Sequence, residues 1–254
     1  MNRFAGFLLV LLFIFAAAGC SGGGPPNAVH SPEDVNGRII GALSGSASAL
    51  LAGELGVAHT FIDTDEMMDH LRIGTVDCVI MERVLAEETV VSVANVRVIG
   101  EPLLEYDLRF AVAKENNQLL MAVNEALVAL SDNGTLGALR GKYFAGRNYT
   151  YTPSGEDNDS TRYLSLAVPN DSPPFSYIDS NGEHTGLDVE VARAVSDYLG
   201  VELRITEVDV SELVSAVWYG NTDLSMGWLP DDIGDFVDVS DSYAASAHVV
   251  IVRN

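Results

Sequence analysis

The segment Leu71-Arg72-Ile73-Gly74-Thr75-Val76-Asp77-Cys78-Val79-Ile80-Met81 reads as one complete corner between a helix and a strand. Gly74 is the residue type that most often ends a helix, because glycine adopts the left-handed backbone conformation without strain. The apolar run at 76–81 is short and follows directly, which predicts a buried strand. A helix that returns at once into a buried strand is typical of a parallel α/β sheet.

A second corner of the same design lies far downstream. It reads Val217-Trp218-Tyr219-Gly220-Asn221-Thr222-Asp223-Leu224-Ser225-Met226, again with a glycine, two residues, an aspartate and a strand. We expect Asp77 and Asp223 to bind backbone groups rather than to perform chemistry. The repetition predicts two similar α/β lobes.

Elements around both corners extend the pattern. Before the first corner we expect a strand at 38–43, a helix at 49–55, a short strand at 61–62 and a helix that starts near residue 64. Around the second, the pattern predicts a strand at 164–168, a helix at 187–199 and a strand at 202–207. Residues 107–113 read as an extended crossover, and 119–130 and 136–144 as helices. The polar stretch at 148–162 reads as a flexible linker.

The first twenty residues resemble a lipoprotein signal peptide. Arg3 precedes an apolar run that ends at Ala17-Ala18-Gly19-Cys20, and glycines and prolines follow. We expect residues 1–20 to act as a lipoprotein signal that is cleaved before Cys20, so that the lipidated Cys20 becomes the new N-terminus and 21–32 form a flexible tether to the outer face of the membrane. An uncleaved anchor and a plain secretory signal are the alternatives.

Composition excludes several other functions. The formal net charge is −22, with only 14 lysines and arginines, and such a surface repels nucleic acid. The five histidines have no metal-ligand spacing, so we expect no metal and no cofactor. With Cys20 lipidated, Cys78 has no partner for an intrachain disulfide, and we expect it to be a small buried strand residue.

The downstream half resembles the type II periplasmic solute-binding proteins of family 3, which bind polar amino acids for ABC transporters. The resemblance rests on Pro173-Pro174-Phe175-Ser176-Tyr177-Ile178-Asp179, on Gly186-Leu187-Asp188-Val189-Glu190-Val191-Ala192-Arg193-Ala194 and on Val239-Ser240-Asp241-Ser242-Tyr243. These are similar to that family's N-terminal half. Residues 32–41, 119–127, 132–136 and 142–144 are similar to its second lobe and C-terminal return.

The halves therefore stand in reverse order, which implies a circularly permuted chain. The resemblance assigns 33–109 to lobe two, and 110–147 with 163–254 to lobe one. It implies the family's architecture of two Rossmann-like lobes with mixed, mostly parallel sheets. It also places the new termini at a former hinge strand, so that only the crossover at 107–113 is covalent. Two incomplete tandem copies left by gene truncation are the alternative.

The resemblance implies an extracytoplasmic monomer that captures an amino-acid- or amine-like solute and delivers it to an ABC permease. No catalysis is expected. One alternative is a ligand sensor that presents its closed form to a receptor, and another is a degenerate scaffold without ligand. A third is an enzyme similar to cyclohexadienyl dehydratase, against which we note that no histidine lies in the predicted cleft segments.

The turn before the helix at 49–55 is the first predicted part of the cleft. Free amides and the helix dipole attract a carboxylate there, and the family holds its ligand's carboxylate at this turn. The ligand-binding residues expected from it are Leu43, Ser44, Gly45, Ser46 and Ala47.

Glu82 follows the strand at 76–81, where the family has an aspartate that pairs with the ligand's ammonium. Arg83 beside it could neutralise it instead.

The wall from lobe one departs from the family pattern. Family members carry an arginine after the strand that is here 224–226, and it clamps the ligand's carboxylate. This chain has none at that place, and an ordinary α-amino acid bound in the ordinary way is therefore in doubt. Trp228 could offer an aromatic face, and Asp231 or Asp232 could favour a cation. A solvated acidic loop with a Trp that only packs is equally compatible. The residues expected to line this wall are Asn170, Asp171, Ser172, Phe175, Gly227, Trp228 and Asp231.

Overall fold

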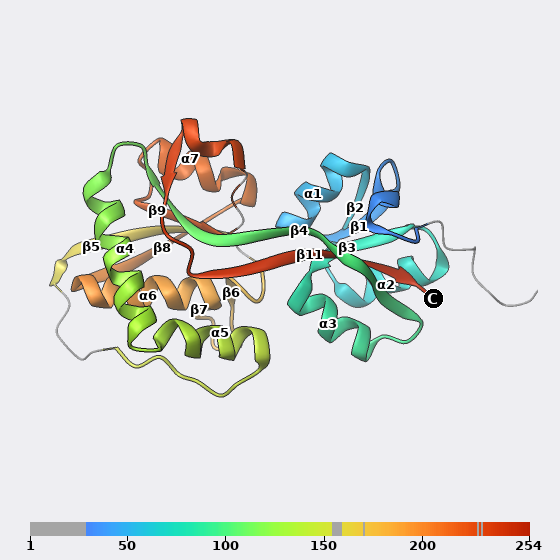
Figure 1. The fold of residues 1–254 in the computed structure, drawn as a ribbon, viewed down its shortest axis with the longest axis horizontal. Helices are drawn as coiled ribbons and strands as arrows, with labels where there is room; N and C mark the ends of the chain where they lie inside the picture. Colours follow the sequence, from blue (N-terminus) through green and yellow to red (C-terminus); the bar gives the residue numbers. More distant parts are fainter. Residues whose placement is uncertain (1–28, 154–158, 170, 228, 230) are drawn as a thin grey trace, which may run out of the picture.

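Two α/β lobes lie side by side in the computed structural model and are joined by two long strands (Figure 1). The structure describes residues 29–153, 159–169, 171–227, 229 and 231–254. The predicted tether is described only from residue 29, and Cys20, Asn170 and Trp228 lie outside the described residues. Two Rossmann-like lobes with mixed sheets are the architecture that the sequence predicted.

Lobe two contains the first corner. Its sheet is parallel between neighbours β2, β1 and β3. Its elements are η1 (Pro32–Val35), β1 (Ile39–Leu43), α1 (Ala47–Leu55), β2 (Val57–Phe61), α2 (Thr64–Ile73), β3 (Cys78–Glu82) and α3 (Arg83–Ser92).

Lobe one contains the second corner, with β5 parallel to both β8 and β9. Its elements are α4 (Asn117–Asp132), α5 (Thr135–Ala145), β5 (Asp159–Pro169), β6 (Tyr177–Ile178), β7 (His184–Thr185), α6 (Leu187–Leu199), β8 (Val201–Val208), η2 (Val210–Glu212), α7 (Leu213–Trp218), β9 (Leu224–Gly227), η3 (Asp231–Asp235) and β10 (Val237–Val239).

Strands β4 (Val96–Ala113) and β11 (Ala244–Arg253) both run from one lobe into the other (Figure 1). They pair with each other in antiparallel fashion, and β11 also pairs with β3 of lobe two. The expectation of a single crossover at 107–113 is therefore wrong. The last residues of the chain, which we assigned to lobe one with the rest of 163–254, lie in the sheet of lobe two. The main-chain N–H of Asn254 donates to Asn95 O there at 3.0 Å.

The core of lobe two shows the two-residue period of a strand that is buried on both faces. Cys78 and Ile80 pack into one hydrophobic cluster, whereas Val79 and Met81 pack into another on the opposite face. Cys78 is confirmed as a buried strand residue, and burial raises the pKa of its thiol to about 12. The thiol is therefore not a nucleophile at neutral pH.

Both corner aspartates bind the backbone as predicted. Asp77 Oδ2 accepts from the N–H of Ile39 at 3.0 Å, at the start of β1. Asp223 Oδ2 accepts from the N–H of Ser165 at 2.8 Å and from its hydroxyl at 2.6 Å, on β5. Each aspartate thus fixes the strand that follows its corner to the neighbouring parallel strand.

Part of the predicted linker at 148–162 is ordered against lobe one. Tyr149 and Tyr151 pack on its hydrophobic core, and the Tyr151 hydroxyl donates to Asp197 of α6 at 2.8 Å. Residues 159–162 already belong to β5. Polarity misled the prediction, because the tyrosines that hold this segment stand among residues typical of a linker.

Candidate functional site

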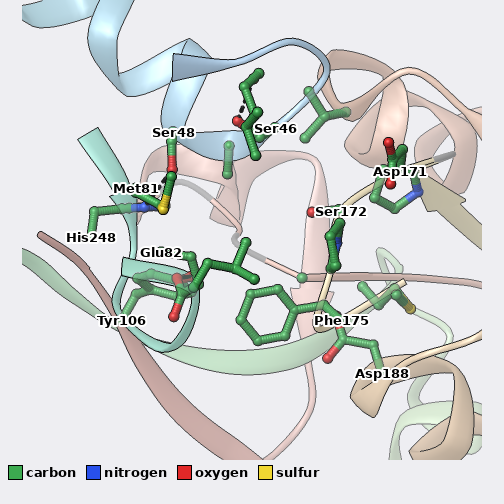
Figure 2. Close-up of a pocket in the computed structure, with 18 of the residues that line it drawn as sticks. Ser46, Ser48, Met81, Glu82, Tyr106, Asp171, Ser172, Phe175, Asp188 and His248 are labelled. Atoms are coloured by element: carbon green, nitrogen blue, oxygen red, sulfur yellow. Dashed lines mark hydrogen bonds between the residues drawn. The ribbon is translucent and has the colours of Figure 1, made fainter. Parts of the chain in front are cut away.

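A pocket with an empty volume of about 640 Å³, its open mouth included, lies between the two lobes. Strand ends and helix starts from both lobes supply its walls, as expected for a ligand site in open α/β sheets. Tyr106 of β4 and His248 of β11 come from the two crossing strands (Figure 2). The pocket therefore touches both lobes and the strands that connect them.

Of the turn before α1, Leu43, Ser46 and Ala47 line the pocket, but Ser44 and Gly45 are not among the lining residues. The N–H of Ser44 donates to Phe61 O at 2.7 Å within lobe two. Ser46 is the N-cap of α1, and its hydroxyl accepts from Ala49 N at 3.2 Å. The first turn of α1 thus borders the pocket, with one of its free amides already bound by this cap.

Glu82 lies at the end of β3 and is only 5% exposed. Its carboxylate accepts from the Tyr106 hydroxyl at 2.5 Å and from the Ser246 hydroxyl. Burial raises the pKa of Glu82, and these two hydrogen bonds oppose the rise. Arg83 points elsewhere and pairs with Glu105 at 3.4 Å, so the expected alternative in which it neutralises Glu82 is wrong.

Asp171, Ser172, Phe175 and Gly227 line the wall from lobe one. Asn170 and Trp228 lie outside the described residues. Asp231 begins η3 and is not among the described lining residues.

Phe175 and Asp188 are held together by a close backbone approach. Asp188 N donates to Phe175 O at 3.1 Å. Gly186 makes this possible: its φ is 118°, and a Cβ there would lie 2.1 Å from Phe175 O. Only glycine fits this position, and it places Asp188 in the first turn of α6, at the wall of the pocket.

Asp188 lines the pocket and was missed by the sequence analysis as a site residue. It is 0% exposed, and burial raises the pKa of its carboxyl to about 8, with the nearby Tyr243 hydroxyl opposing the rise and Glu82 adding to it. No signal in its segment marks the role, because an aspartate in the first turn of a helix is ordinary.

His248 also lines the pocket, which overturns the expectation that no histidine lies in the cleft. Its ring stacks on Tyr106 with centroids 5.0 Å apart, and its Nδ1 lies 3.1 Å from the Ser48 hydroxyl. Burial lowers its pKa to about 4, so the imidazole is neutral at pH 7. The prediction failed because β11 was not foreseen as a strand of lobe two.

No group of three or more metal-ligating side chains occurs in the described part of the chain. None of the helices in that part is both long and apolar enough to cross a membrane.

Residues 164–254 match the family model of bacterial extracellular solute-binding proteins, family 3. This part of the chain belongs to that family. The chain is also similar to the L-cystine-binding protein TcyJ of Escherichia coli K12, with 29% identity over 125 residues, 48% of this chain and 47% of that relative. The chain thus spans about half the length of the curated relatives it matches.

Two solved structures are similar to the chain over most of its length. A phosphate-binding protein of a phosphate ABC transporter from Streptococcus pneumoniae TIGR4 shows 15% identity and a TM-score of 0.44, over 86% of this chain and 89% of that one. The ancestral amino acid-binding protein AncCDT-1 shows 13% identity and a TM-score of 0.41, over 85% and 81%.

Proposed function

We propose that this protein captures a small polar solute, amino-acid-like or amine-like, in the cleft between its lobes and delivers it to the permease of an ABC importer. The observation that carries the proposal is the pocket itself, which takes its walls from both lobes and two residues, Tyr106 and His248, from the crossing strands. A ligand in that place contacts both lobes, so binding favours their closure around it. The protein then acts by closing, without chemistry.

Thermal unfolding against a panel of amino acids, amines and polyamines tests this proposal. A ligand that binds only the folded state stabilises it by about 2.7 kcal/mol at a hundredfold excess over Kd. We expect at least one member to raise the melting temperature in a concentration-dependent way. No shift with any member contradicts the proposal.

Glu82→Gln tests the pocket as the place of binding. This change keeps the size of the side chain and removes its charge, so Tyr106 and Ser246 retain a partner. We expect at least a tenfold loss of affinity for the solute found above, measured by calorimetry, with native circular dichroism. If the variant binds the solute with unchanged affinity, Glu82 is not part of the binding site.

We propose that the protein works outside the cytoplasm, held at the membrane by a lipid on Cys20. The proposal rests on the sequence of the first twenty residues. Fatty-acid labelling of the full chain in a bacterial host checks it: we expect label on the wild-type protein and none on Cys20→Ala. Label that persists in the variant contradicts it.

A second candidate, an enzyme similar to cyclohexadienyl dehydratase, is favoured by one observation. His248 and Glu82 are opposite each other on β11 and β3, and both line the pocket, so a base and an acid are present there. Pure protein incubated with cyclohexadienyl acids tests it. Turnover that is lost in His248→Gln supports the enzyme, and its absence leaves binding as the function.

We also propose that the chain is circularly permuted. The proposal is supported by the positions of η1 and the end of β11, the two segments that would be joined in an unpermuted protein. η1 packs on β4, where a Cβ on Gly100 would lie 2.7 Å from Pro32, and the end of β11 is bound to Asn95, just before the same strand. Both segments thus meet at the start of β4, in lobe two.

A further inference from the structure

Two carboxyl groups, one from each lobe, meet the pocket. Glu82 comes from the end of β3 in lobe two, and Asp188 from the start of α6 in lobe one. Figure 2 shows them on either side of the Phe175 ring. The two groups are close enough that the charge of Glu82 raises the pKa of Asp188.

Their surroundings differ in one decisive respect. Glu82 accepts two hydroxyl hydrogen bonds, from Tyr106 and Ser246. Asp188 is fully buried, and neither of its oxygens makes a hydrogen bond of ordinary geometry with the described residues, although the Tyr243 hydroxyl lies near enough to lower its pKa. Its Oδ2 lies beside Gly227, where an added Cβ would be 3.8 Å away. Burying a carboxyl group without a good hydrogen-bond donor costs free energy. A ligand that brings a donor to Asp188 would remove this cost.

The described lining contains no positively charged side chain that could pair with a ligand's carboxylate. No lysine or arginine is among the described lining residues. Of the neighbouring residues whose side chains are not described, none is basic; they are Asn170, Trp228, Pro230, Asp231 and Asp232. Arg83 and Arg109 line a wider groove outside the pocket and pair with Glu105 and Asp107.

Most of the remaining lining is apolar and suits a hydrocarbon or aromatic body. The apolar lining residues are Leu43, Ala47, Ile80, Met81, Leu85, Pro169, Pro173, Phe175, Val210, Leu213 and Met226.

We infer that the pocket takes a small organic amine with an apolar body and no carboxylate, its ammonium bound to Asp188 with Glu82 as the second acceptor. An ammonium supplies the donors that Asp188 lacks, and its charge is balanced by a carboxylate from each lobe. The carboxylate of an amino acid would instead meet two acidic groups. This inference rests on the proposed function, since it names the ligand class of the same cleft.

Matched pairs of an amino acid and its decarboxylated amine test the ligand class on the full protein. Suitable pairs are phenylalanine with phenethylamine, tyrosine with tyramine, leucine with isopentylamine, and lysine with cadaverine, measured by calorimetry. We expect the amine to bind at least tenfold more tightly in one or more pairs. Amino acids that bind as well as or better than their amines, for example through the first turn of α1, overturn the inference and leave the proposed function standing.

Other solutes separate the two proposals further. A neutral or anionic solute that binds where all the amines fail also overturns the amine inference, and it contradicts the proposed function as well if the amino acids also fail. Absence of binding by every solute tested contradicts both.

Asp188→Asn tests the ammonium contact, because it keeps the shape and removes the charge. We expect a loss of amine affinity of tenfold or more. The matched control is Glu190→Gln on the same helix. The carboxylate of Glu190 binds Lys142 at 2.5 Å and Tyr143 at 2.7 Å and does not line the pocket. The amine affinity of this control variant should stay unchanged. Unchanged affinity in a folded D188N variant overturns the contact.

A comparison of two ligands on the wild-type protein tests whether the ligand must carry an ammonium, even if D188N does not fold. Phenethylamine and 2-phenylethanol share the same body and differ in the ammonium. We expect the alcohol to bind at least tenfold more weakly. Equal binding of the two overturns the inference.

Discussion

Asp188 is a fully buried acid at the pocket that the sequence analysis did not choose. It lies beside Tyr243, the charge of Glu82 on β3 raises its pKa, and its own charge raises the pKa of Tyr106 on β4. Burial raises the pKa of its carboxyl from the ordinary 3.8 to about 8. The unliganded protein therefore holds this carboxyl protonated at neutral pH, and an arriving cation favours release of the proton.

The raised pKa predicts how stability depends on pH. Between its ordinary pKa and about 8 the folded state keeps a proton on Asp188 that the unfolded chain releases. The free energy of unfolding therefore falls as pH rises through this window, and levels off above it. Below pH 6.5 the lowered pKa of His248 acts in the opposite sense, so the window from 6.5 to 8 avoids the contribution of His248.

Urea unfolding at several pH values checks this prediction. In the wild-type protein we expect a loss of up to about 1.4 kcal/mol per pH unit between 6.5 and 8. The slope should be much smaller in D188N. Parallel pH profiles for the two proteins would show that another group titrates in this window.

At the scale of elements, the corner is the unit that builds each lobe. The same glycine and aspartate end the helix and start the next strand in both, and the aspartate reaches across to the neighbouring strand. The strand ends that follow the two corners, Met81–Glu82 and Met226–Gly227, both line the pocket. The two corners therefore fix the positions of the strand ends that form opposite walls of the pocket.

Removing the corner carboxylates should cost stability unequally. Asp223 accepts two hydrogen bonds from Ser165, whereas Asp77 accepts one from Ile39. Hydrogen bonds to a charged group contribute about 1.5–3 kcal/mol, so we expect D223A to lower the free energy of unfolding more than D77A. Denaturant unfolding measures both. Ligand affinity should stay unchanged, because neither residue lines the pocket; a larger cost in D77A would contradict the argument.

At the scale of the whole molecule, two strands rather than one connect the lobes. β4 and β11 pair along most of their lengths, and β11 continues into the sheet of lobe two beside β3. The proposed permutation would therefore leave both strands that connect the lobes in place. We expect lobe closure to proceed as in an unpermuted protein, not more loosely.

A rearranged chain tests the permutation directly. It starts at residue 159, runs to Asn254, and continues through a short glycine-serine linker into residues 29–153, so that Val29, Tyr149 and Tyr151 keep their packing. Since the segments to be joined both meet β4, the linker has little distance to span, and loop length costs little entropy. We expect a melting temperature within a few degrees of the wild type and the same ligand preference. A chain that does not unfold cooperatively would contradict the proposed permutation.

Local pattern alone determined much of this protein. The helix at 187–199 and the buried strand after Gly74 follow from periodicity and from a glycine that ends each helix. Glu82 could be placed at a strand end, and Phe175 and Gly227 at the pocket wall, because their neighbours in sequence carry recognisable signals.

Only the tertiary structure decided the pairing of β11 with lobe two and, through it, the presence of His248 in the cleft. Ser48 and His248 are 200 residues apart in the chain yet form one hydrogen bond. Asp188 likewise becomes a site residue only when β9, β3 and α6 close around it. Burial, and the pKa it shifts, is a property of these distant contacts, which no local stretch of sequence encodes.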